Sequence, residues 1–246
     1  MAEELPGLHH VTAITADAQK NIDFYAGVLV LRLVKLTVNF DDPASYHLYY
    51  GDELGRPGTV MTFFAWPGAR RGRIGPPQVS VTAFAAPTAA IGFWAERLAS
   101  RGVSTQPLAD RFDENGLSFS DPDGLQLEIV GSASPAGESW KADPVAVDYA
   151  LRGFRSVTLA EEGYEKTARL LTDVMGFSPA GSDQNRYRYQ AGGGENFAGL
   201  VDVLCVPDAK HGGMGAGAVH HVAFRTPDDV RQAAWRREIV RAGLNV

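Results

Sequence analysis

One order of expected elements occurs four times along these 246 residues. Each copy begins with a short alternating strand, continues into an amphipathic helix that ends near a glycine, and then returns to strand-like runs, except that the last copy stops after its helix. The copies begin near Leu8, Val79, Gly153 and Val219, so successive starts are 71, 74 and 66 residues apart. This regular spacing predicts four βαβββ units that share one geometry.

The predicted fold class is α+β, with tandem βαβββ units that form curved mixed sheets and carry their helices on the outside. We expect residues 1–132 to hold the first two units and residues 133–149 to form a linker rich in small residues. Residues 150–246 then hold the third unit together with the first strand and helix of a truncated fourth unit. The truncation predicts an unpaired strand edge and leaves association into a homo-oligomer open.

Composition restricts the function classes. Hydrophobic residues make up 45% of the chain and charged residues 21%, a balance that can bury a sizeable core in one or two globular domains. The formal net charge of −6 disfavours binding to nucleic acid or to an anionic membrane surface. No apolar run approaches the roughly 20 residues of a membrane helix, and the N-terminus lacks the features of a signal peptide. We therefore expect a cytoplasmic protein.

Two near-identical tetrads mark the first and the fourth unit. They read Leu8-His9-His10-Val11 and Val219-His220-His221-Val222, and they contain four of the six histidines of the chain. Both tetrads lie in short alternating runs with β-branched residues, so each histidine is expected on a strand and not on a mobile loop. Metal-binding imidazoles are usually held in this way.

Strand geometry selects one histidine of each pair. Neighbouring side chains on a strand point to opposite faces of the sheet. On this alternation His10 shares the more polar face with Thr12, whereas His9 and His220 fall on an apolar face that should receive the helix of the unit. His10 and His221 are therefore the candidate metal ligands, and they meet at one ion if two units pair about a pseudo-twofold axis.

Two neutral imidazoles need at least one further protein ligand. A carboxylate beside two histidines leaves open positions suited to non-haem Fe(II) oxygen chemistry. Glu128 is expected to be the only carboxylate on a strand that closes a unit, and its apolar run would make an unpaired charge costly. The corresponding strand of the fourth unit, where the partner of His10 and His221 is first expected, would lie beyond Val246.

Several runs of the sequence resemble a known family. Residues 8–14, 21–29, 32–52 and 219–224, together with Pro57-Gly58-Thr59, are similar to the hydroquinone-type ring-cleaving dioxygenases of the vicinal oxygen chelate (glyoxalase/bleomycin resistance/extradiol dioxygenase) superfamily. The resemblance covers essentially the whole chain. It implies the βαβββ fold of that superfamily and an extradiol-type dioxygenase that opens a hydroquinone or catechol-like ring with O2.

The same resemblance implies a ligand set. Fe(II), or in some members Mn(II), would be bound by His10, by His221 and by a glutamate that has no counterpart before Val246. The positions that would orient these ligands or handle substrate protons match His9, Thr12 and His220.

A histidine beside the metal but not bound to it would act as acid or base, because its ordinary pKa lies near operating pH. His9, His47 and His220 all fit this role, and the sequence does not choose among them. Two positions depart from the family pattern. Val30 stands where a glycine is usual after the first helix, and Arg155 stands where the third unit often carries a histidine.

Two other function classes stay open. A glyoxalase-like isomerase or lyase would use His10 with Glu128, and a non-catalytic protein would sequester an aromatic compound or an antibiotic in the same cavity. A His221→Ala variant separates the two enzymes, because only the dioxygenase needs that side chain. The expected partners are accordingly a small aromatic substrate and O2, with no nucleic acid and no membrane.

Overall fold

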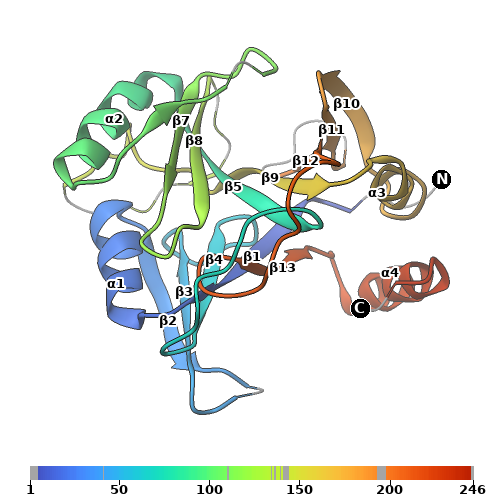
Figure 1. Cartoon of the computed structure of the whole chain (residues 1–246), viewed down its shortest axis with the longest axis horizontal. Coiled ribbons are helices and arrows are strands. Elements are labelled where there is room, and N and C mark those ends of the chain that lie inside the picture. Colours follow the sequence, from blue (N-terminus) through green and yellow to red (C-terminus); the bar gives the residue numbers. More distant parts are fainter. Residues whose placement is uncertain are drawn as a thin grey trace.

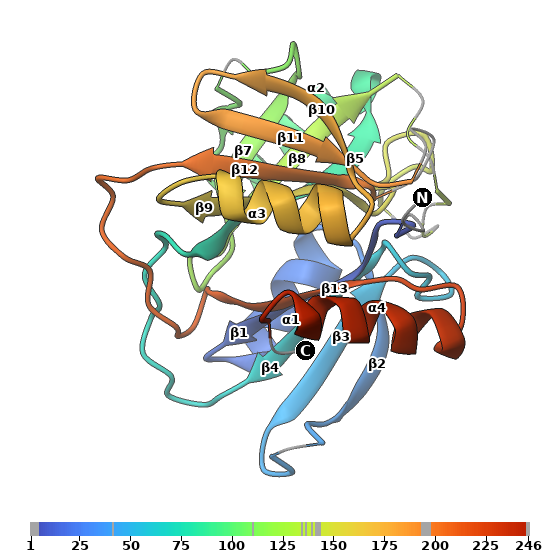
Figure 2. The same cartoon turned by 90° about the vertical axis from the view of Figure 1, so that its right-hand side faces the viewer.

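The computed structural model describes residues 5–40, 42–109, 111–133, 135, 137–138, 140, 144–192 and 198–244. Two mixed sheets lie one above the other, with the helices on their outer sides (Figures 1 and 2). The predicted α+β class with βαβββ units is confirmed. No helix in the described part of the chain is long and apolar enough to cross a membrane.

The smaller sheet has five strands in the order β13-β1-β4-β3-β2. It joins the first unit to the opening strand of the fourth. Within it, β1 pairs parallel with β4 and antiparallel with β13. The strands are β1 (Leu8–Thr15), β2 (Arg32–Val38), β3 (Tyr46–Gly51), β4 (Val60–Ala65) and β13 (Val219–Phe224).

The larger sheet has eight strands in the order β10-β11-β12-β9-β5-β8-β7-β6 and joins the second unit to the third. Its central pairing, β5 antiparallel to β9, repeats the pairing of β1 with β13. The second unit supplies β5 (Gln78–Pro87), β6 (Gln106–Pro107), β7 (Gly116–Ser120) and β8 (Gln126–Ser132). The third supplies β9 (Phe154–Glu161), β10 (Ser178–Asp183), β11 (Arg186–Gln190) and β12 (Leu200–Cys205).

The helices follow the opening strand of each unit. They are α1 (Ala18–Ile22) continuing as the π-helix η1 (Asp23–Val28), α2 (Ile91–Ser100) after the short 3₁₀ turn η2 (Thr88–Ala90), α3 (Glu165–Arg169) continuing as the π-helix η3 (Leu170–Val174), and α4 (Asp229–Arg241). Asp17 caps α1 by accepting hydrogen bonds from two backbone N–H groups of its first turn. Arg97 of α2 donates to the carbonyls of Gly27 and Val28, so the otherwise unsatisfied end of η1 is held by the neighbouring unit.

The apolar faces of sheets and helices form one core. Tyr25 of η1 packs between Tyr50 and Phe63, with ring centroids 5.2 and 4.5 Å away. In the second unit Trp94 of α2 is fully buried and its indole N–H donates to the Tyr149 carbonyl at 2.8 Å. This core covers one face of each sheet. The polar residues of the five-stranded sheet gather on the opposite face of that sheet.

Candidate metal centre

Irregular pairing between β1 and β13 sets the direction of the first histidine in each tetrad. The register shifts twice, so that His9 is an extra residue in β1 and His220 is an extra residue in β13. An extra residue of this kind, a β-bulge, re-aims its side chain and breaks the alternation of faces. The prediction that His9 and His220 lie on the helix-facing side is therefore wrong. His220 is exposed, His9 is half-buried, and each ring contacts the ring that follows it.

The second histidines of the two tetrads meet. The Nε2 atoms of His10 and His221 lie 3.1 Å apart, and their rings are nearly perpendicular at 80°. The side chains come from adjacent strands, β1 and β13, although 211 positions separate them in the sequence. The structure thus brings together the two residues that the sequence selected as a pair.

The other nitrogen of each ring faces a neighbouring histidine. Nδ1 of His10 lies 2.9 Å from Nδ1 of His9, and Nδ1 of His221 lies 2.9 Å from Nδ1 of His220. When His10 and His221 donate from Nδ1–H in these contacts, both Nε2 lone pairs face the point that the two rings share. Proteins fix the tautomer of metal-binding imidazoles by such a bond from the second nitrogen.

The pair fits two positions of a metal site. Two nitrogens that bind one ion at about 2.1 Å and at right angles lie roughly 3.0 Å apart, close to the 3.1 Å between these Nε2 atoms. Imidazole nitrogens suit iron and the neighbouring transition metals. Within the described residues, no set of three His, Cys, Asp or Glu side chains is placed to hold a metal ion. The described residues therefore place two imidazole nitrogens together and no third metal-binding side chain beside them.

Burial keeps both imidazoles neutral. Burial, and then the nearby His221, His9 and His47, lower the pKa of His10 to about 4. Burial, followed by His220, also lowers the pKa of His221. Metal ions bind the neutral imidazole, so protons compete weakly for these nitrogens near neutral pH.

A line of hydrogen bonds runs from this pair across the sheet. Thr12 Oγ1 lies 3.0 Å from His221 Nε2 and 2.7 Å from Thr62 Oγ1. Thr62 Oγ1 in turn lies 3.0 Å from His47 Nε2, and Tyr49 OH lies 2.9 Å from His47 Nδ1. His47 thus belongs to the site network. Sequence reasoning missed Thr62 and Tyr49, although strand alternation puts Tyr49 on the same face as His47.

An aromatic surface borders the imidazoles. Phe64 and Trp66 stack with centroids 6.2 Å apart and planes 9° from parallel. The ring of His220 meets both of them edge-on, 5.2 Å from Phe64 and 6.2 Å from Trp66. Sequence reasoning did not single out Phe64 and Trp66, at the end of β4, as site residues. Their contact with His220 joins positions that are far apart along the chain.

Glu128 does not belong to this site, and its expected role as a metal ligand or as partner of His10 is corrected. It lies on β8 of the eight-stranded sheet, where both its carboxylate oxygens accept hydrogen bonds from Arg111. The guanidinium compensates the buried charge that the apolar run of the sequence made costly. Glu128 is also not the only carboxylate on a closing strand, because Asp202 lies on β12 and is fully buried.

These carboxylates belong to an ion-pair network on the eight-stranded sheet. Arg188 binds Asp202 at 2.7 Å and Glu114 at 2.8 Å. Arg155, the residue found where a histidine is frequent in the family, binds Glu114 at 2.9 Å. The two sheets share the same central pairing of opening strands, but one carries histidines beside it and the other carries arginine–carboxylate pairs.

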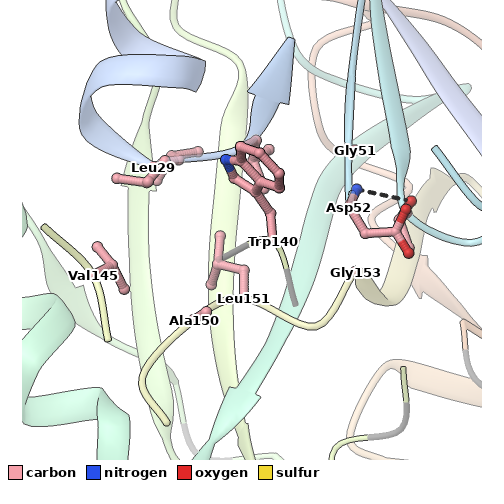
Figure 3. A pocket seen from close by; sticks show the side chains of 11 residues that line it. Leu29, Gly51, Asp52, Trp140, Val145, Ala150, Leu151 and Gly153 are labelled. Carbon is pink, nitrogen blue, oxygen red and sulfur yellow. Dashed lines mark hydrogen bonds between the residues drawn. The ribbon is translucent and has the colours of Figure 1, made fainter. Parts of the chain in front are cut away.

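A small pocket lies away from the imidazoles (Figure 3). Leu29, Trp140 and Leu151 are among its lining residues, and the backbone N–H of Asp52 donates a hydrogen bond of 3.3 Å to Thr59 Oγ1. Its volume of about 10 Å³ admits no more than about one water molecule. It is too small to be a substrate site.

Comparison with known proteins agrees with this architecture. Residues 7–129 match the model of the Glyoxalase/Bleomycin resistance protein/Dioxygenase superfamily. The chain is 46% identical to MhqO of Bacillus subtilis (strain 168), which is provisionally named a ring-cleaving dioxygenase. The alignment covers 100% of this chain and 78% of MhqO. It is 35% identical, over 99% of its own length and 77% of the relative, to the chlorohydroquinone/hydroquinone 1,2-dioxygenase of Sphingobium indicum.

Solved structures show the same fold. A crystal structure of a protein provisionally named a dioxygenase, from Bacillus subtilis subsp. subtilis str. 168, superposes with a TM-score of 0.93 at 45% identity, covering 99% of this chain and 77% of that one. Glyoxalase I from Zea mays superposes with a TM-score of 0.71 at 15% identity, covering 96% and 80%, which concerns the fold alone. The chain therefore belongs to the glyoxalase, bleomycin resistance protein and dioxygenase superfamily and, within it, to the ring-cleaving dioxygenases.

Proposed function

We propose that this chain is a metal-dependent dioxygenase that opens the ring of a hydroquinone or catechol-like compound with O2, and that His10 and His221 are two of its metal ligands. The observation that carries the proposal is the 3.1 Å approach of their Nε2 atoms. The substrate class is supported by the relative named for chlorohydroquinone and hydroquinone. Fe(II) is the proposed metal, with Mn(II) as the alternative, because two imidazoles leave positions open for oxygen chemistry.

When bound, the metal ion would lower the pKa of a phenolic hydroxyl and carry electrons between the aromatic ring and O2. The protein supplies position and proton handling. His10 and His221 present neutral nitrogens, and His9 and His220 hold those rings through the Nδ1 contacts. Phe64 is buried behind the imidazoles, and the half-buried Trp66 that stacks on it offers an indole against which an aromatic substrate can pack.

Three further side chains are proposed to act on substrate protons. The buried hydroxyl of Thr12 lies 3.0 Å from His221 Nε2. It can accept a hydrogen bond from, or donate one to, a substrate that binds beside this nitrogen. His9 and His220 each have a second ring nitrogen that the contact with the following histidine does not use. Burial, together with the charge of Arg225, lowers the pKa of His9, so its neutral form can accept a proton near neutral pH.

Anaerobic titration with Fe(II), followed by oxygen uptake with hydroquinone, tests the proposal. The protein is compared with His10→Ala, His221→Ala and the control His211→Ala, whose exposed side chain pairs with Glu162. We expect one Fe(II) per chain and oxygen uptake for the unaltered protein and the control, and loss of both in the other two. Fe(II) binding that survives His221→Ala would refute the assignment.

The competing isomerase or lyase predicts a different result. It needs no oxygen uptake and no His221, and it requires the pairing of His10 with Glu128 that the structure replaces with the Arg111 ion pair. A binding protein would retain affinity for hydroquinone after a chelator removes the metal. No contact in the described residues favours either of these functions over the dioxygenase.

A further inference from the structure

The hydrogen bonds that begin at Thr12 do not stop inside the site. They continue through Thr62 and His47 to Tyr49, with donor–acceptor distances of 2.7, 3.0 and 2.9 Å. The two threonines are buried, with 0% and 1% of their surface exposed, whereas His47 and Tyr49 are half-buried. The line therefore leads from the imidazole pair to side chains that reach solvent.

The strands hold these side chains in line. Thr12 lies opposite Thr62 in the parallel pairing of β1 with β4, and Tyr49 lies opposite Thr62 in the antiparallel pairing of β3 with β4. His47 comes two residues before Tyr49 on β3, so both side chains point to one face. The order of the sheet, β1-β4-β3, thus determines the order of the hydrogen bonds (Figure 1).

Each member of the line can both accept and donate a proton. A threonine or tyrosine hydroxyl has one proton and free lone pairs, and a neutral imidazole has one nitrogen of each kind. His47 uses both nitrogens, Nε2 toward Thr62 and Nδ1 toward Tyr49. Valine would fill the place of a buried threonine without the cost of burying a hydroxyl.

We propose that Thr62, His47 and Tyr49 form a relay that moves the substrate's phenolic proton from Thr12 to solvent. This rests on the proposed function, since it requires a hydroxylated aromatic ring beside His10 and His221. It assigns His47 and Tyr49 to proton transfer at a distance from the reacting atoms, where they do not touch the substrate.

The proton balance closes over five transfers. The phenolic O–H gives its proton to Thr12 Oγ1, Thr12 gives its own proton to Thr62 Oγ1, and Thr62 gives its own to His47 Nε2. His47 releases the proton on Nδ1 to the Tyr49 oxygen, and Tyr49 releases its hydroxyl proton to water. One proton leaves the substrate, one enters solvent, and His47 ends as its other tautomer. In that tautomer the line points back toward the site and can return a proton to the ring-opened product.

The surroundings keep His47 neutral, as a relay requires. Lys35 of β2 lies on the same side of the sheet, with its ammonium 5.5 Å from the centre of the Tyr49 ring. The other titratable groups near His47 in the described residues are Tyr49, His221 of β13 and His10 of β1, and the ring centroid of Phe64 lies 4.5 Å from that of the imidazole. Burial, then His221 and Lys35, lower the pKa of His47 to about 4.

Anaerobic stopped-flow measurement of proton release tests the relay. Fe(II)-loaded protein is mixed with hydroquinone in weak buffer with a pH indicator, and the rate and total yield of released protons are recorded. Thr62→Val breaks the line in its middle, and Tyr49→Phe removes its outer end. Matched controls are Thr37→Val, which lies opposite His47 on β2, and Tyr46→Phe, an exposed tyrosine on β3.

We expect Thr62→Val to slow proton release by about 10²-fold, near the lower end of what a positioned acid–base group contributes. Tyr49→Phe should slow it less, because water can replace the terminal hydroxyl. Hydroquinone affinity and proton yield should stay within about twofold of the unaltered protein, and both controls should release protons at the original rate. Millimolar imidazole should restore the rate of a His47→Ala variant, which a purely structural histidine would not permit.

Two results would overturn the relay. Release in Thr62→Val as fast as in Thr37→Val, at equal yield, would remove the relay and leave the proposed function standing. If the unaltered, metal-loaded protein binds no hydroquinone and releases no proton, the proposed function fails and the relay fails with it.

Discussion

The Nε2 atoms of His10 and His221 lie 3.1 Å apart because β1 and β13 are neighbours in one sheet. The antiparallel pairing puts Thr12 opposite His221, and the bulge at His220 adjusts the position of that strand. The eight-stranded sheet uses the same central pairing and carries no such pair of histidines in its described residues. Both sheets thus share the pairing of opening strands, and the side chains that those strands carry decide the chemistry.

The first prediction concerns the histidines that precede the ligands. His9→Phe and His220→Phe keep an aromatic ring but remove the nitrogen that contacts His10 or His221. We expect each change to weaken Fe(II) binding about 10- to 100-fold, because the ligand rings lose the bond that fixes their tautomer. Anaerobic calorimetric titration measures the affinity, and His211→Phe serves as control. Unchanged affinity in both variants would show that the Nδ1 contacts do not orient the ligands.

The second prediction concerns the stability of the metal-free protein at acidic pH. His47 has an ordinary pKa of 6.5 when unfolded and about 4 when folded, so between these values the unfolded chain binds more protons. The free energy of unfolding of the metal-free protein should therefore fall as pH decreases from 6.5 to about 4. Urea unfolding of the protein and of His47→Gln across this range measures the effect. The variant should show a shallower decrease, and an equally steep one would contradict the assignment.

The third prediction concerns the ion pairs of the other sheet. Burial alone would raise the pKa of Glu114, but Arg188 and Arg155 outweigh it and hold the pKa at about 2. Glu114→Gln removes one of the two carboxylates that compensate the buried Arg188 guanidinium and should lower the free energy of unfolding by about 3 kcal/mol, the lower end of the cost of breaking a buried ion pair. The exposed control Glu138→Gln should change it by less than about 0.5 kcal/mol. Fe(II) stoichiometry should stay the same in both, because the network lies outside the five-stranded sheet.

The fourth prediction concerns a strained residue. Val30 follows the first helix with a φ of 55°, in the left-handed region that β-branched residues avoid. Val30→Gly should raise the free energy of unfolding by roughly 1 kcal/mol, since strain of about 1–2 kcal/mol exceeds the loss of a half-buried side chain. Val28→Gly, inside η1, should lower it instead. Thermal unfolding compares the two, and destabilisation by both would show that the Val30 backbone is not strained.

Much of the fold could be predicted because its signals are local. The opening strands β1, β5, β9 and β13 begin within about one residue of the predicted starts of the four units, because the alternation of apolar and polar residues is a property of adjacent positions. Alternation failed at His9 and His220, because a bulge depends on the register of a partner strand. Glu128 was misassigned for a related reason: its partner, Arg111, comes from a loop 17 positions earlier that carries no periodic signal.

The sequence by itself determined that two matching histidine pairs sit on the opening strands of repeated units, and it restricted the candidate metal ligands to one residue of each pair. Only the tertiary structure decided that these strands are neighbours, that His9 and His220 turn toward the same cluster, and that Thr62, His47 and Tyr49 extend it. The physical reason is that sequence patterns act over a few neighbouring residues, whereas the contacts of the site join distant ones. Periodicity fixes where a side chain points relative to its own strand, whereas contact between side chains depends on which strands pair and in what register.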